Sequence, residues 1–203
     1  VCPTVFEPDG NTLAIFELNG DLADASGNAR DASMIAGTFV PTSWGMGFSV
    51  PGNTTQGFQW NAFASLVAHP YTIEMVVVAA SVSCYKKLFG PSDTLDSGWY
   101  FCNRFRAYPQ QTAIGPDLAA NVRYYIAVVS TATNRVDVYL DGTRIGSTAT
   151  FTAPPAAAIF YRDDTVTQRT EALDGVIDAV RISHVARTAT EIAAISTRLA
   201  AQP

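Results

Sequence analysis

Short runs of apolar residues recur along the chain and are separated by polar segments rich in turn-forming residues. The longest run is Y-T-I-E-M-V-V-V-A-A-S-V, residues 71–82. Twelve residues could form a helix, but the β-branched content and the apolar residues at every second position, Tyr71, Ile73, Met75 and Val77, favour a central strand. A second long run, V-R-Y-Y-I-A-V-V-S-T, predicts another strand over residues 122–131.

The closing segment L-D-G-V-I-D-A-V-R-I-S-H, residues 173–184, predicts a strand that begins after the turn dipeptide Asp174-Gly175. Thr188 and Glu191 then stand at the spacing of a capping box, which predicts a helix over 189–200. A tight turn is expected at Asp141-Gly142, between strands 134–140 and 143–150. Besides the closing strand, at residues 176–184, further strands are expected near residues 13–18, 33–39, 47–50, 57–60, 86–89, 98–103 and 158–161.

Many short strands at close spacing predict an all-β fold, a two-sheet antiparallel jelly-roll sandwich with a short C-terminal helix. The first residues, 1–12, are polar and rich in turn formers, so we interpret them as an N-terminal arm. Residues 13–203 would then form a single domain, a normal size for a sandwich of this type.

Composition and charge limit the kinds of partner that the chain is expected to bind. The chain has 203 residues, of which 48% are hydrophobic and 15% are charged, with a net charge of −5. The 13 Lys and Arg residues are scattered, whereas a nucleic-acid partner would require a basic stripe. No apolar run approaches the ~20 residues that cross a bilayer. We therefore expect no nucleic-acid partner and no insertion into a membrane.

Three cysteines are present, at positions 2, 84 and 102. A hairpin over residues 90–97 would bring Cys84 close to Cys102, and a disulfide there would contribute about 3 kcal/mol. The alternative is two buried thiols. With a disulfide, Cys2 would be left as a free thiol or as a link to another chain. Disulfide bonds favour an oxidising compartment, so we expect a secreted or cell-surface protein.

Three motifs in order suggest a family. They are D-A-S-G-N (residues 24–28), the V-D-V-Y-L-D-G-T-R-I-G hairpin (residues 136–146) and the closing strand G-V-I-D-A-V-R-I-S followed by T-E-I. Together they resemble the laminin G-like jelly rolls of the concanavalin A-like lectin/glucanase superfamily, of the kind found in bacterial exported surface proteins. The resemblance implies the jelly-roll fold and says little about the ligand.

Catalysis is weakly supported by the motifs. Glucanases of this superfamily are similar to one another in an E-x-D-x-x-E strand, which holds two carboxyl groups about 5 Å apart. The chain has no such triplet, and Glu74 is the single acid in its strand. The R-x-E-L-R and Q-I-H strands of jelly-roll alginate lyases are missing too. The two histidines, His69 and His184, have no partner motif for a nucleophile or zinc.

A structural calcium is the metal that the resemblance implies. Calcium needs six to eight oxygen ligands. Asp24 and Asn28 would supply some from the D-A-S-G-N loop, and Asp178 would add charge from the last strand, because first and last strands of a jelly roll lie near each other. In the alternative interpretation Asp24 and Asn28 cap their loop, while Asp178 pairs with Arg181 or bonds to backbone amides.

A glycan site needs an aromatic ring and planar polar groups. The stretch W-Y-F-C-N-R-F-R-A-Y offers Trp99, Asn103, Arg104 and Tyr108, and a second polar cluster at a strand end offers Asp163 and Asp164. Alternation sends Trp99 and Tyr100 to opposite faces, and one of these faces must be core. The competing interpretation is that most of the rings pack the sandwich.

These observations favour a non-catalytic extracellular binding or adhesion module that recognises a glycan or another surface component. A second hypothesis is a self-assembling surface or matrix subunit that forms homo-oligomers through residues 1–12 and Cys2. A third is a glycan-active enzyme without a recognisable motif.

Overall fold

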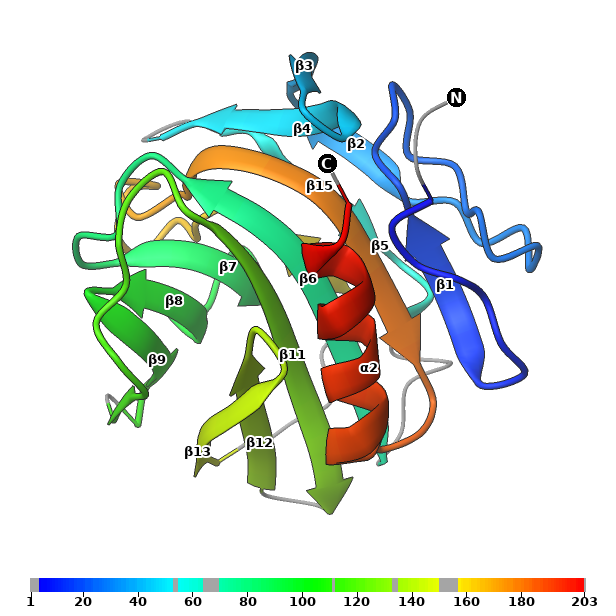
Figure 1. Cartoon of the computed structure of the whole chain (residues 1–203). Helices are drawn as coiled ribbons and strands as arrows, with labels where there is room; N and C mark the ends of the chain where they lie inside the picture. The colour runs from blue at the N-terminus through cyan, green and yellow to red at the C-terminus, as the bar shows by residue number, and fades with distance from the viewer. Residues whose placement is uncertain are drawn as a thin grey trace.

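Two antiparallel sheets packed face to face form the molecule (Figure 1). The computed structural model describes residues 4–52, 55–63, 70–110, 112–132, 135–149 and 157–202. The predicted all-β sandwich with a C-terminal helix is confirmed. The eight-stranded sheet has the order β13-β12-β11-β6-β15-β4-β3, with β1 beside β15, and the seven-stranded sheet has the order β10-β9-β8-β7-β14-β5-β2.

The strands of the eight-stranded sheet are β1 (Thr12–Phe16), β3 (Thr38–Thr42), β4 (Gly45–Pro51), β6 (Tyr71–Ala79), β11 (Arg123–Ala132), β12 (Arg135–Leu140), β13 (Thr143–Thr148) and β15 (Asp174–Ser183). Those of the seven-stranded sheet are β2 (Ser33–Ala36), β5 (Gly57–Trp60), β7 (Lys86–Gly90), β8 (Gly98–Cys102), β9 (Arg104–Tyr108), β10 (Ala113–Ile114) and β14 (Ala158–Phe160). The helix α2 spans Ala189–Ala200, as predicted, and Thr188 and Glu191 form the predicted capping box.

The core between the sheets is rich in aromatic rings. Phe58 stacks on Phe160 with ring centroids 4.9 Å apart, and Phe48 meets Phe58 edge to face. Rings of this size bury large apolar areas and favour such offset and edge contacts. The inward-facing side of each sheet is therefore committed to packing, and only the outer faces remain for binding.

Helix α2 covers the outer face of the eight-stranded sheet, where it lies across β6, β11 and β15 (Figure 1). The N-terminal segment packs into the same layer: Val5 and Phe6 are buried there beside Ile192 and Leu199 of the helix. Within the predicted arm, Val5 and Phe6 thus belong to a second core of the domain itself, whereas residues 7–11 are exposed. Cys2 lies outside the described residues.

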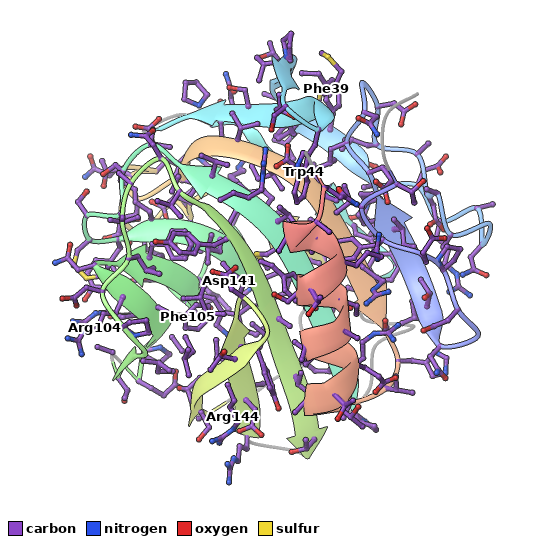
Figure 2. All side chains as sticks on the ribbon, in the orientation of Figure 1. Phe39, Trp44, Arg104, Phe105, Asp141 and Arg144 are labelled. Carbon is purple, nitrogen blue, oxygen red and sulfur yellow. A yellow bond between two sulfur atoms is a disulfide. The ribbon has the colours of Figure 1, made fainter. Side chains whose placement is uncertain are left out.

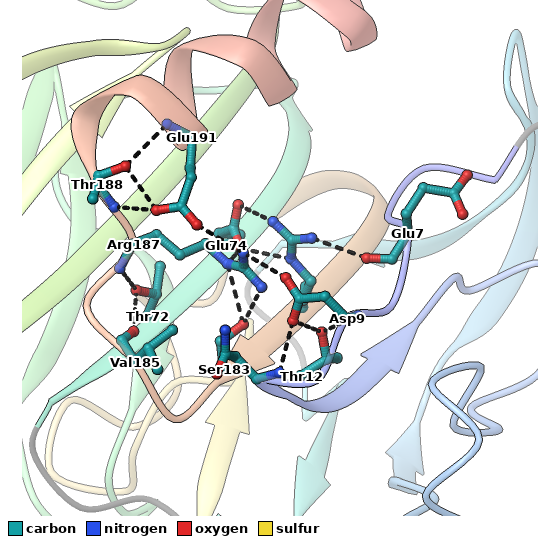
Figure 3. Close-up of polar contacts among 12 residues, drawn as sticks. Glu7, Asp9, Thr12, Thr72, Glu74, Ser183, Val185, Arg187, Thr188 and Glu191 are labelled. Carbon is teal, nitrogen blue, oxygen red and sulfur yellow. Dashed lines mark hydrogen bonds and ion pairs between the residues drawn. The ribbon is translucent and has the colours of Figure 1, made fainter.

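Hydrogen bonds and ion pairs between charged side chains hold the helix, the N-terminal segment and the sheet together (Figure 3). The Glu74 carboxylate is fully buried, and it accepts hydrogen bonds from Arg181 at 2.6 and 2.8 Å and from the Tyr125 hydroxyl at 2.5 Å. Arg187 lies 3.2 Å from the same carboxylate and 2.9 Å from Asp9 of the N-terminal segment. A buried, fully paired carboxylate of this kind serves structure and is closed to substrates.

Candidate functional site

Of the side chains predicted to bind a ligand, Arg104 and Tyr108 lie on the outer face of the seven-stranded sheet. Along β8, Trp99 and Phe101 point into the core, whereas Tyr100 points outward opposite Arg106 of β9. Trp99 is fully buried and stacks on Phe89 with centroids 4.7 Å apart. Trp99 is therefore wrong as a sugar-stacking ring, because none of its surface is accessible to a ligand.

Three tyrosines lie together on this outer face, and we call them the tyrosine face: Tyr85, Tyr100 and Tyr108. The Tyr85 ring meets Tyr100 at 5.6 Å and Tyr108 at 6.4 Å, both close to perpendicular. Tyr100 is fully buried, while Tyr85 and Tyr108 are half-buried. The predicted residue Tyr108 thus belongs to a cluster whose other two members, Tyr85 and Tyr100, were not among the residues predicted to bind.

A buried ion cluster lies next to the tyrosine face. The Lys87 Nζ is 2.6 Å from Asp164 and 3.6 Å from Asp163, and all three side chains have no exposed surface. Asp163 also accepts hydrogen bonds from the Thr167 hydroxyl at 2.6 Å and the Glu171 amide at 2.9 Å. The predicted ligand residues Asp163 and Asp164 are therefore wrong as direct contacts, because their carboxylates hold the 161–171 segment onto Lys87.

Two further carboxyl groups border the tyrosine face. Burial and the neighbouring charges of Asp163, Asp96 and Asp164 raise the pKa of Glu171 to about 7. Burial and the charge of Asp164 also raise the pKa of Asp96, which accepts a hydrogen bond from Tyr108. Part-buried carboxyls with raised pKa values are typical of functional surfaces. Neither residue was predicted, since neither stands in a recognisable motif.

Asn103 and Arg104 form the turn between β8 and β9, at one end of the outer face. Asn103 is exposed and adopts a positive φ of 55°. Arg104 shares the outward register of β9 with Tyr108 and pairs with Asp117 at 2.7 Å, both side chains being largely exposed. These two predicted residues are accessible, and they lie at the margin of the tyrosine face.

The predicted disulfide between Cys84 and Cys102 is confirmed. It joins the segment before β7 to the end of β8. Tyr85 follows Cys84 directly in the chain, so the disulfide fixes the backbone that carries one ring of the tyrosine face. This bond links the stability of the β7–β8 pair to the geometry of the site.

The residues predicted to bind calcium have other partners. Asp24 accepts hydrogen bonds from the amides of Ile15, Ser26 and Arg30 at 2.9 to 3.0 Å, and these bonds outweigh its partial burial and lower its pKa. The Asn28 amide donates to the carbonyls of Thr12 and Leu13. Both residues are used to close the loop onto β1.

Asp178 lies elsewhere, 3.0 Å from the Arg123 guanidinium, and burial raises its pKa. Nowhere in the described ranges do three His, Cys, Asp or Glu side chains gather closely enough to hold a metal ion. The arrangement of Asp24, Asn28 and Asp178 does not fit a calcium site. It fits the alternative interpretation of a capped loop, with Arg123 in place of Arg181 as the partner of Asp178.

Comparison with known proteins identifies the superfamily of this fold. The sequence profile described as "Concanavalin A-like lectin/glucanases superfamily" matches residues 51–193. The chain belongs to this superfamily. No curated protein matches the chain in sequence.

Solved structures show the same sandwich at low sequence identity. Domain 4 of AbnA, a GH43 extracellular arabinanase from Geobacillus stearothermophilus solved in complex with arabinotriose, has a TM-score of 0.68 and 14% identity. The match covers 92% of this chain and 98% of that domain. The superfamily member described here therefore corresponds to a whole domain of the arabinanase.

Two other similar structures are larger proteins. Trypanosoma rangeli sialidase in complex with sialic acid has a TM-score of 0.70 and 14% identity, covering 98% of this chain and 36% of the sialidase. The binding domain of Paraclostridial Mosquitocidal Protein 1 has a TM-score of 0.69 and 11% identity, covering 93% of this chain and 52% of that domain. At these identities the likeness shows the superfamily fold alone.

No helix in the described part of the chain is long and apolar enough to cross a membrane.

Proposed function

We propose that this chain is a non-catalytic carbohydrate-binding module and that the tyrosine face is its binding surface. The observation that carries the proposal is the pair of half-buried rings, Tyr85 and Tyr108, set nearly at right angles beside two carboxyl groups. An aromatic ring can stack on the apolar face of a sugar, and carboxyl oxygens accept hydrogen bonds from its hydroxyls. Rings held by a disulfide and a buried ion cluster lose little entropy on binding.

Similar structures support a carbohydrate ligand. The arabinanase domain was solved with arabinotriose and the sialidase with sialic acid. A further similar structure, with a TM-score of 0.68, concerns botulinum neurotoxin type C, whose cell entry depends on interaction with two ganglioside molecules. The tyrosine face is proposed from this chain's own residues.

A glycan array followed by titration calorimetry tests the proposal. Replacing Tyr85 or Tyr108 by Ala should weaken binding of the best array ligand by about 10-fold or more, because a stacking ring typically contributes over 1 kcal/mol. The matched Tyr85→Phe variant keeps the ring and should bind nearly as well as the native chain. Equal affinity in the native chain and both Ala variants would reject the tyrosine face as the site.

The non-catalytic part of the proposal needs its own assay. Glu171 and Asp96 both have raised pKa values, as a general acid would. Incubating the native chain with the array ligand and separating the products by chromatography should show intact ligand. Release of shorter sugars that Glu171→Gln abolishes would instead assign the chain to the glycan-active enzymes.

An exported location is proposed on the disulfide, since such bonds persist in oxidising compartments. Thermal melting tests whether the chain binds calcium. Because the Asp24 carboxylate is occupied by amides, we expect the same melting temperature with calcium and with a chelator. A fall of several degrees on chelation would show a metal site.

Self-assembly is the second candidate. Val5 and Phe6 of the N-terminal segment are buried in their own domain, so an assembly would use Cys2 or another surface. Light scattering with and without reductant is the measurement. We expect a monomer under both conditions.

A further inference from the structure

Beyond the tyrosine face, on the other side of the sandwich, a groove runs beside helix α2. Two hollows of about 310 and 360 Å³ adjoin there and share Asp141, Ser196 and Ala200 in their linings. Figure 2 shows Asp141 on the side of the helix that faces β11 and Trp44 beyond the C-terminal end of the helix. Each hollow has the size of a small-molecule site.

Small side chains on one side of the helix create the open space. Ala193, Ser196 and Ala200 recur at helical spacing and line the hollows opposite the β12–β13 turn. The turn comes close to the helix at Gly142, where φ is 82° and an added Cβ would lie 2.8 Å from Ser196. The helix therefore rests on Gly142 and leaves the groove open on either side.

A stacked pair forms the wall at the C-terminal end of the helix. The Arg123 guanidinium lies 4.0 Å over the Trp44 ring, and Arg123 donates hydrogen bonds to Asp178 and Ser43, each at 3.0 Å. Trp44 and Asp178 are buried, so the guanidinium plane is held rigidly at the groove. Asp178 already balances the charge of Arg123, which leaves no net positive charge to recruit a phosphate or carboxylate.

Hydrogen-bonding groups line the rest of the groove. One oxygen of Asp141 accepts from the Tyr125 amide at 2.9 Å, which fixes the carboxyl group, and burial raises its pKa. The Gln202 side-chain oxygen is buried and has no hydrogen-bond partner in the described ranges. Hydroxyls of Thr143, Ser196 and Thr197 line the second hollow. Acceptors outnumber fixed donors, so a donor-rich ligand would satisfy them.

We infer that this groove is a second binding site, for a neutral polyhydroxylated ligand such as a short oligosaccharide. Val76, Leu199 and Ala200 give the first hollow an apolar floor, and the polar groups stand around it. Apolar surface with a few fixed polar groups is the usual composition of small-molecule sites. The two adjoining hollows suit more than one sugar ring.

Amide chemical-shift titration of the native chain by NMR tests this site. The probes are three neutral trisaccharides, arabinotriose, maltotriose and cellotriose, each added to about 10 mM, a range that detects millimolar dissociation constants. At least one probe should give saturable shifts at Asp141, Ser196 and Gln202. If none of the three shifts these amides, the inference is overturned.

Variants separate this groove from the tyrosine face. Ala200→Tyr fills the space shared by both hollows and should weaken binding by about 10-fold or more, whereas the same change at Ala194, an exposed helix position outside the groove, should leave it unchanged. Asp141→Asn keeps an acceptor for the Tyr125 amide and tests the carboxylate.

The double variant Tyr85→Ala and Tyr108→Ala should keep the shifts at Asp141, Ser196 and Gln202. Their loss in that variant would contradict a second site. So would equal binding in the native and Ala200→Tyr chains. A negative result for the tyrosine face in its own assay would not contradict binding in the groove.

Discussion

Glu171 lies at the edge of the tyrosine face, where burial and three neighbouring carboxyl groups raise its pKa from 4.5 to about 7. The unfolded chain therefore ionises this group first as pH rises. The folded state loses stability between about pH 4.5 and pH 7, and the loss is complete above that window. Below it, both states are protonated and the group contributes nothing.

Replacing Glu171 by Gln should remove this pH-dependent cost. We expect the free energy of unfolding of Glu171→Gln to exceed that of the native chain at pH 8 and to match it at pH 4. Urea titrations at the two pH values measure the difference. The same difference at both pH values would mean that the carboxyl's ionisation is not the cause.

Lys87 is the second residue with a large expected effect. Lys87→Met keeps the length of the side chain but leaves Asp163 and Asp164 as buried charges without their cation, which should lower the free energy of unfolding by about 3–5 kcal/mol. Lys86→Met is the matched control, and as a half-buried lysine with no such partner role it should change stability by about 0.5 kcal/mol or less. Urea midpoints of the three proteins decide the matter, and equal losses in both variants would contradict a special role for Lys87.

At the residue scale, sequence patterns predicted which side chains share a face of a strand better than they predicted the contacts of those side chains. Alternation separated Trp99 from Tyr100 correctly, but only the packed sandwich shows which of the two faces is core. Asp178 illustrates a different limit. The register between β15 and β6 shifts between Ile177 and Ala179, so Asp178 stands at a β-bulge and meets Arg123 from another strand. The spacing of residues along the sequence does not predict such a contact.

At the scale of elements, long apolar strands and the capped helix were predictable. The residues of β6 and β11 and the bounds of α2 follow from β-branched runs and a capping box. The strands β9 and β10 were not predicted, because R-F-R-A-Y carries two charges in five residues and β10 has only two residues. Both are held by pairing with β8 and its neighbours rather than by their own propensity.

The disulfide is the element whose removal should affect stability and binding together. Changing both Cys84 and Cys102 to Ser should lower the free energy of unfolding by about 3 kcal/mol, because the bond closes a short loop in the unfolded chain. Glycan affinity at the tyrosine face should also fall, since Tyr85 loses its anchor. Calorimetric melting and titration of the double variant measure the two effects, and unchanged affinity would show that the sheet alone positions Tyr85.

For the whole molecule, the N-terminal segment acts as part of the core. Phe6 is fully buried, lies 5.0 Å from the Arg181 guanidinium and contacts the Tyr125 ring. Phe6→Ala should lower the free energy of unfolding by about 3–5 kcal/mol without changing molecular mass in solution. Glu7→Ala, an exposed neighbour that bonds Arg181 only through its backbone carbonyl, is the control and should have little effect. Dimers or larger species of the native chain that dissociate in the Phe6→Ala variant would instead indicate that the N-terminal segment is exchanged between chains.

The position of β15 in the eight-stranded sheet bears on how the chain is made. β15 is the last strand in chain order, yet it is central, with β6 on one side and β4 and β1 on the other. A nascent chain that has not yet delivered β15 has exposed edges on all three partners, and such edges invite pairing with other chains. The eight-stranded sheet therefore cannot close until β15 has been synthesised. We expect a nascent chain that ends before β15 to depend on chaperones.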